Sequence, residues 1–142
     1  MRTTAREPDD AALRELLRTS RRIAVVGLSP RPDRPSHGVA AYLQRSGYTI
    51  VPVNPCGGSI LGEPVHPTLK DAAAAGRIDV VDVFRRSDAL PALAPEIIAI
   101  RPRLAWFQIG VTDDGAARAL RAAGIPLVMD RCLAVDHQLL GV

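Results

Sequence analysis

The chain has 142 residues, a formal net charge of +3 and only 4% aromatic residues. This length suits one domain with one core, and a domain of this size buries enough surface to fold without disulfides or metals. The arginines are scattered and aromatics are few, which argues against nucleic-acid binding, and no apolar run reaches the ~20 residues that span a bilayer.

The N-terminal segment lacks the apolar stretch of a signal peptide. We expect residues 1–9 to form a flexible polar arm and residues 10–142 to form the domain. The two cysteines, Cys56 and Cys132, match no metal-binding or redox spacing, which is typical of free thiols in a reducing compartment. A cytoplasmic location is therefore expected.

Apolar periodicity, capping residues and glycine or proline stops define the predicted elements in chain order. Helices are expected from Asp9 or Asp10 to about Thr19, from Ser36 to Gly47, from Thr68 to Ala75, from Ser87 to Pro102, from Asp113 to Ala123, and for one or two turns within Leu133–Leu140. Strands are expected at Ile23–Val26, Thr49–Val53, Ile78–Phe84, Leu104–Ile109 and Leu127–Met129, with an uncertain short strand within 59–67.

Strands that alternate with helices and are almost entirely apolar predict a parallel sheet covered on both faces. We therefore expect an α/β fold: a single doubly wound, Rossmann-like domain with a five-stranded parallel sheet in the order 3-2-1-4-5. Ligands bind such sheets past the carboxyl ends of the strands, where the strand order reverses. The expected crevice lies between the strands at 23–26 and 104–109.

The segment 22–38 joins a strand, a glycine turn and a helix start, the arrangement that binds phosphate groups. Gly27 permits close approach of the backbone, Ser29 and Ser36 offer hydroxyls, and Arg31 and Arg34 can add charge-assisted hydrogen bonds. The backbone amides around His37 and Gly38 are further expected donors. The glycine spacing departs from the Gly-x-Gly-x-x-Gly of dinucleotide sites. In the alternative interpretation Gly27 only turns the chain and the arginines are solvated. Ser36 is expected to cap the helix rather than to form a catalytic pair with the adjacent His37.

The ends of the other strands narrow the choice of ligand. Asn54 and Pro55 stand where NAD sites usually carry a carboxylate, which favours a phosphorylated ribose such as that of NADP or coenzyme A; Asn54 could instead only stabilise the turn. Phe84 could contact a purine edge or belong to the core, and Arg85 and Arg86 in the same loop offer cations for a ribose phosphate. Gln108 interrupts an apolar strand and must find a polar partner, either in a ligand or in the protein.

Several motifs in order also carry a family resemblance: Val-Val-Gly-Leu-Ser at 25–29, Arg-Pro-Ser-His at 34–37, Val-Pro-Val-Asn-Pro at 51–55, Asp-Val-Phe-Arg at 82–85, Trp-Phe-Gln-Ile-Gly at 106–110 and Asp-Arg-Cys-Leu at 130–133. Together they resemble the small bacterial CoA-binding proteins, a family similar to the N-terminal domain of the succinyl-CoA synthetase α subunit.

The resemblance implies that coenzyme A or an acyl-CoA binds with its pyrophosphate over the first loop. It implies adenosine near Asn54–Pro55 and Val83–Arg85, and the pantetheine arm past Gln108 and Ile109. The synthetase has a lysine in the loop equivalent to Cys56-Gly57, which this chain lacks, and its phosphorylated histidine belongs to a domain absent here, so synthetase chemistry is not implied. The expected ligand contacts are Gly27, Leu28, Ser29, Arg31, Arg34, Ser36, Asn54, Pro55, Val83, Phe84, Arg85, Gln108, Ile109 and Gly110.

A catalytic role has weaker support. Cys132 and His137, with Asp136, suggest a nucleophile and base, but a spacing of five residues would turn them about 140° apart on a helix. A buried cysteine and a hydrogen-bonded histidine are the expected roles, and no metal site is expected because the three histidines lie on separate segments. We expect a non-catalytic CoA-binding or sensing module. The alternatives are an NADP-dependent oxidoreductase, an acyl-CoA-processing enzyme, or a regulatory protein that uses the fold without ligand. A protein partner or homo-oligomer is left open.

Overall fold

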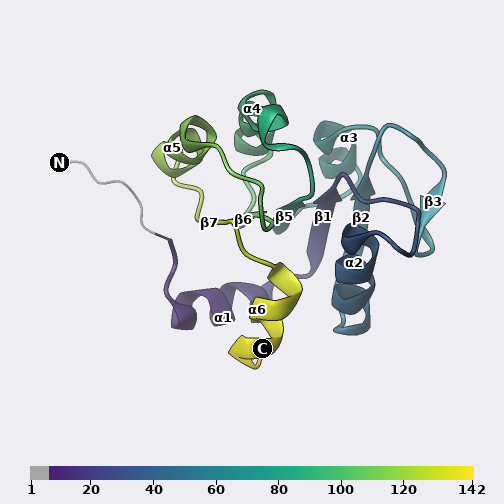
Figure 1. The fold of residues 1–142 in the computed structure, drawn as a ribbon, viewed down its shortest axis with the longest axis horizontal. Coiled ribbons are helices and arrows are strands. Elements are labelled where there is room, and N and C mark those ends of the chain that lie inside the picture. Colours follow the sequence, from purple (N-terminus) through teal and green to yellow (C-terminus); the bar gives the residue numbers. More distant parts are fainter. Residues whose placement is uncertain (1–6) are drawn as a thin grey trace.

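The computed structural model describes residues 7–142; residues 1–6 of the expected N-terminal arm lie outside the described part of the chain. A central sheet is covered by α3, α4 and α5 on one face and by α1, α2 and α6 on the other (Figure 1). The helices are α1 (Asp10–Thr19), α2 (Pro35–Arg45), α3 (Leu69–Ala74), α4 (Leu90–Ile100, after a 3-10 turn at Ser87–Ala89), α5 (Asp114–Ala122) and α6 (Leu133–Leu140). The strands are β1 (Arg22–Val26), β2 (Thr49–Val53), β3 (Ser59–Ile60), β4 (Glu63–Pro64), β5 (Val80–Val83), β6 (Leu104–Phe107) and β7 (Leu127–Met129).

Three helices begin at side-chain caps: the side chains of Asp9, Thr68 and Asp113 accept hydrogen bonds from backbone amides of the first turn. The expected cap at Ser36 is wrong. Helix α2 begins one residue earlier, at Pro35, and the N-cap position is Arg34, which makes no side-chain cap. Proline is favoured in the first turn because it has no N–H to satisfy and its φ angle already suits the helix.

The α/β class and the doubly wound, five-stranded parallel sheet are confirmed, but the detailed strand order differs from the expected one. The observed order is β2-β1-β5-β6-β7, which is 2-1-3-4-5 when these five strands are counted along the chain. Strand β5 pairs with β1 and with β6, so that Asp82 lies opposite both Val25 and Trp106. The connection through α3 carries the chain from β2 across β1, so that β5 lies next to β1 on the side away from β2.

This strand order changes where the connections between consecutive strands reverse their direction across the sheet. The chain leaves β1 toward β2 and then returns across β1 to reach β5, and the two connecting helices α2 and α3 lie on opposite faces. In such sheets the ligand crevice opens at the carboxyl ends of the strands on either side of the reversal. The crevice therefore belongs between β1 and β5, not between β1 and β6 as the sequence predicted.

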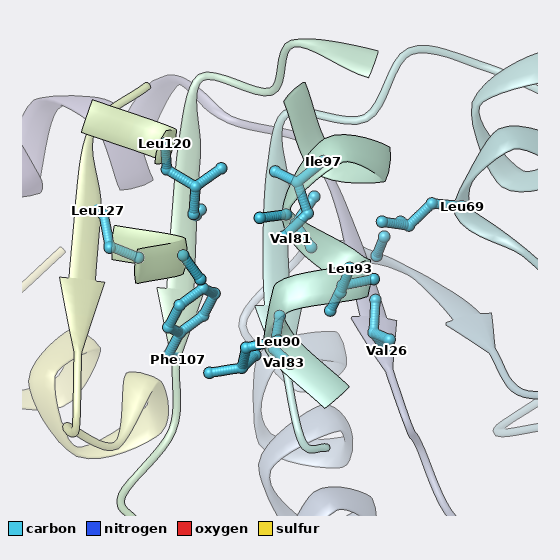
Figure 2. Packing of buried hydrophobic residues seen from close by; sticks show 14 of the residues in the cluster. Val26, Leu69, Val81, Val83, Leu90, Leu93, Ile97, Phe107, Leu120 and Leu127 are labelled. Carbon is cyan, nitrogen blue, oxygen red and sulfur yellow. The ribbon is translucent and has the colours of Figure 1, made fainter. Parts of the chain in front are cut away.

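Two apolar clusters hold the layers together. The first packs α3, α4 and α5 onto the sheet (Figure 2), where Val81, Val83, Leu90 and Ile97 are fully buried. The second joins α1, α2 and α6 to the opposite face and includes the buried Trp106. No helix of residues 7–142 is long and apolar enough to cross a membrane.

Candidate functional site

Gly27 directly follows β1 and brings the end of this strand against the end of β5. Its φ angle is +86°, and a Cβ atom built on it would lie 2.4 Å from the carbonyl oxygen of Phe84. The Phe84 amide donates to the Val26 carbonyl at 2.8 Å, and the Gly27 amide donates to the Val53 carbonyl at 2.9 Å. Glycine is therefore required here both for its conformation and for the close approach of two backbones.

The loop from Gly27 to α2 is folded by two serines. The Ser36 hydroxyl is buried and accepts a hydrogen bond from the Ser29 amide at 3.0 Å, and the Ser29 hydroxyl accepts one from the Arg31 amide at 3.1 Å. The amides of His37 and Gly38, expected to face a phosphate, both donate to the Arg34 carbonyl. Both of these amides therefore already have a backbone partner.

Asn54 fastens this loop to the end of β2. Its side-chain amide donates to the Leu28 carbonyl at 2.7 Å, and its carbonyl oxygen accepts from the Cys56 amide at 2.9 Å. Both ends of the side chain are thus engaged within the protein, as the turn-stabilising interpretation of Asn54 requires. The position stays neutral beside the crevice.

Two cavities meet at the Gly27 turn, and both are lined by Gly27 and Phe84. One, of about 370 Å³, extends over the loop before α2 and is also lined by Ser29, Arg31, Arg34, Pro35 and Ser36. The other, of about 360 Å³, extends between β2 and β5 and is also lined by Val26, Val53, Asn54, Pro55, Pro67, Arg85 and Arg86. We call the two together the Gly27 cleft. A larger cavity, of about 720 Å³, lies elsewhere, between α3 and α4.

Four arginines give the cleft a positive charge. The guanidinium of Arg31 lies 3.2 Å from Asp33, and that of Arg86 lies 3.2 Å from Asp88, in pairs whose side chains are mostly exposed. Arg34 and Arg85 are exposed, and neither has a carboxylate within ion-pair distance among residues 7–142. Water screens the two exposed pairs strongly, so all four cations can be redirected to an anionic ligand.

Some of the expected contacts lie away from the cleft. Leu28 and Val83 are fully buried in the two apolar clusters. Ile109 is 70% exposed beyond the end of β6, and the amide of the neighbouring Gly110 donates to Asp130 at 2.7 Å. Sequence reasoning offered Arg86 beside Arg85 as a cation for a ribose phosphate but left it out of the expected ligand contacts, although it lines the cleft. It also missed Pro67, which reaches the cleft because His66 bridges to Val53.

Gln108 belongs to a buried polar cluster on the α6 side of the sheet. Its amide nitrogen lies 3.5 Å from Asp82, and its oxygen accepts from the Leu133 amide at 3.2 Å. Asp82 is fully buried, and its second carboxylate oxygen has no hydrogen-bond partner within residues 7–142. Burial raises the pKa of Asp82 well above its usual range, against the smaller opposing effect of the Gln108 hydrogen bond.

The candidate base and its neighbouring carboxylate have partners other than the candidate nucleophile. His137 is buried and hydrogen-bonded through Nδ1 to the Tyr42 hydroxyl at 2.8 Å, as expected for a structural histidine. Asp136 lies 2.6 Å from Arg131, and Cys132 is half-buried at the start of α6. Within residues 7–142 no group of three His, Cys, Asp or Glu side chains is arranged to hold a metal.

Comparison with known proteins adds the family. A family model described as a CoA binding domain matches residues 21–138. The uncharacterized protein YneT of Bacillus subtilis is 43% identical over 130 residues, which cover 92% of this chain and 95% of YneT. A solved structure from Thermus thermophilus is 41% identical, with a TM-score of 0.90 over 94% of this chain and 99% of that one. A hypothetical protein from Pyrococcus horikoshii is 30% identical, with a TM-score of 0.89 over the full length of both chains.

Proposed function

The chain belongs to the family of CoA-binding domains, and from this premise we propose that the Gly27 cleft binds coenzyme A or an acyl-CoA. We further propose that the protein acts as a non-catalytic binding or sensing module. One observation carries the proposal: two cavities, each with two arginines, meet at a glycine turn at the reversal point of the sheet. Coenzyme A likewise carries two separate phosphate groups, the pyrophosphate and the 3′-phosphate.

The cavity over the loop before α2 suits the pyrophosphate. Gly27 lets the backbone approach closely, and Arg31 and Arg34 line this cavity. Each guanidinium presents planar, paired donors that match phosphate oxygens, and a hydrogen bond to a charged group contributes about 1.5–3 kcal/mol. Releasing Arg31 from Asp33 costs little, because the two side chains of that pair are 62% and 66% exposed.

The cavity between β2 and β5 suits the adenosine and its 3′-phosphate. Arg85 and Arg86 line it, and the half-buried Phe84 offers an apolar surface for the purine. Asn54 at the end of β2 is neutral and so does not repel a ribose phosphate. A carboxylate there, about 5 Å from that phosphate, would cost roughly 3 kcal/mol at an effective dielectric constant of 20.

The same lining supports a binding role rather than a catalytic one. Among residues 7–142, the titratable side chains that line the Gly27 cleft are all arginines, which stay protonated and cannot act as general acids or bases. The cleft therefore offers groups that hold anions and no group that moves a proton.

Charge reversal of Arg34 and of Arg85, the two cleft arginines without an ion-pair partner among residues 7–142, tests this assignment. Arg34→Glu and Arg85→Glu should each weaken CoA binding at least about tenfold in isothermal titration, because each loses a charge-assisted hydrogen bond. Arg118→Glu, on the exposed face of α5, is the matched control and should bind CoA within about twofold of the wild type. Unchanged affinity in both cleft variants, or tighter binding of NADPH than of CoA by the wild type, would contradict the proposal.

A further inference from the structure

The cavity of about 720 Å³ between α3 and α4 lies at the edge of the sheet opposite the Gly27 cleft. It is lined by Ile78, which precedes β5, and by Arg101, which precedes β6, so it opens at the amino ends of the strands. The helices α3 and α4 lie side by side on this face of the sheet (Figure 1). Its volume is within the range of small-molecule sites.

Small side chains leave this space unfilled. Helix α3 presents Ala73 and Ala74 to the cavity and helix α4 presents Ala99, and methyl groups are too short to close the gap between two helices. Ile78 lines it while only 3% exposed, and Ile100 is partly buried against the same apolar cluster. The result is a groove with an apolar lining that the core does not occupy.

The rim of the groove is cationic. Lys70, Arg77 and Arg101 line it with a single carboxylate, Glu96. The Nε atom of Arg77 lies 3.5 Å from Asp79, and Nη2 of Arg101 lies 3.5 Å from the Ala123 carbonyl. Both distances are at the outer limit of a hydrogen bond, so most of the donors of the two guanidinium groups remain free for a ligand.

Arg101 is also held in a conformation that favours glycine. It ends α4 with φ +50° and ψ +63°, the left-handed region in which a glycine is the usual residue at a helix end. An arginine in this conformation costs backbone energy that glycine would not. Backbone strain of this kind occurs where a side chain has a use.

We propose that this groove binds an alkyl carboxylate. The alkyl chain lies along Ala73, Ala74 and Ala99 over Ile78, and the carboxylate lies between the guanidinium groups of Arg77 and Arg101. The apolar lining selects a hydrocarbon chain. Lys70, Arg77 and Arg101, set against Glu96 and against Asp79 beside Arg77, leave a net positive charge that selects an anionic end rather than a neutral or cationic one. The site is separate from the Gly27 cleft and does not depend on CoA binding.

Dodecanoate, added below its critical micelle concentration, is the probe. In a titration followed by the amide resonances of nitrogen-labelled protein, we expect saturable shifts confined to the two helix faces and to Arg101. Arg101→Gly should weaken dodecanoate binding about tenfold while leaving the melting temperature equal or higher, because glycine relieves the backbone. Ala99→Leu should block dodecanoate binding because the larger side chain fills the groove while the charge of the protein stays the same.

Arg118→Ala, on α5, is the control for the loss of one positive charge and should bind dodecanoate like the wild type. Shifts that do not saturate or are scattered over the surface would overturn the proposal. So would equal affinity of Arg101→Gly and the wild type, or equally tight binding of dodecyltrimethylammonium. CoA titrations of the same variants should match the wild type, so a failure at this groove is distinguishable from a failure at the Gly27 cleft.

Discussion

Replacing Gly27 with alanine perturbs the point on which the geometry of the cleft depends. The new methyl carbon would lie 2.4 Å from the carbonyl oxygen of Phe84 and 3.0 Å from its carbonyl carbon. Both contacts are with backbone atoms of a strand end that is hydrogen-bonded to β1, so no side-chain rotation relieves them. The ends of β1 and β5 must therefore move apart.

Two costs add in Gly27→Ala. A non-glycine residue with a left-handed backbone costs roughly 1–2 kcal/mol, and forcing an extra methyl into a closely packed site costs about 1–3 kcal/mol. We expect the free energy of unfolding to fall by about 2–5 kcal/mol. Gly124→Ala isolates the first cost, because Gly124 has a φ angle of +81° and a built Cβ would meet nothing within 4 Å. That control should lose only about 1–2 kcal/mol.

Urea denaturation and CoA titration of the two variants test whether the close approach at Gly27 matters for stability and for CoA binding. Gly27→Ala should be clearly less stable than Gly124→Ala. It should also bind CoA measurably more weakly than the wild type under conditions in which it is fully folded. Gly124→Ala should bind CoA like the wild type. Equal stability of the two variants, or wild-type CoA affinity in folded Gly27→Ala, would refute the reasoning from close approach.

Three further predictions concern single side chains. Burial raises the pKa of Asp82 in the folded state, so the stability linked to its proton is fully present below the unfolded pKa of about 4 and is lost as pH rises through the folded pKa. In urea denaturation at a series of pH values, Asp82→Asn should show a smaller fall in the free energy of unfolding with rising pH. A pH profile equal to that of the wild type would contradict this prediction. Asn54→Ala should lower the free energy of unfolding by about 1–3 kcal/mol, measured in the same way, because it removes the partner of the buried Leu28 carbonyl; a cost below the error of the measurement would count against this. Asp33→Asn should tighten CoA binding about two- to fivefold at low salt by freeing Arg31; weaker binding in titration would argue that Arg31 does not contact the ligand.

The local features of the site could be predicted from the sequence because they depend on short-range chemistry. An apolar strand that runs into Gly27 and then into a helix start predicts the turn without any knowledge of the tertiary structure. The structure adds what lies across the turn: the carbonyl of Phe84, 57 positions further along the chain, which makes the glycine obligatory. Sequence patterns indicate the need for glycine but not its partner.

The strand order could not be read from the same patterns. Strands of a parallel sheet are mostly apolar on both faces, so the segment at Val80–Val83, apolar apart from Asp82, fits either beside β2 or beside β1. A right-handed connection serves both positions. The error also explains why the partner of Gln108 remained open. In the expected order the strand that carries Asp82 lies far from the strand that leads to Gln108, whereas in the observed order the two strands are neighbours.

The most direct test compares coenzyme A with 3′-dephospho-CoA on the wild-type protein by isothermal titration. Our assignment of the 3′-phosphate to Arg85 and Arg86 predicts that CoA binds with one-to-one stoichiometry and that loss of this phosphate weakens binding about tenfold or more. The absence of CoA binding at millimolar concentration, or equal affinity for the two ligands, would contradict it.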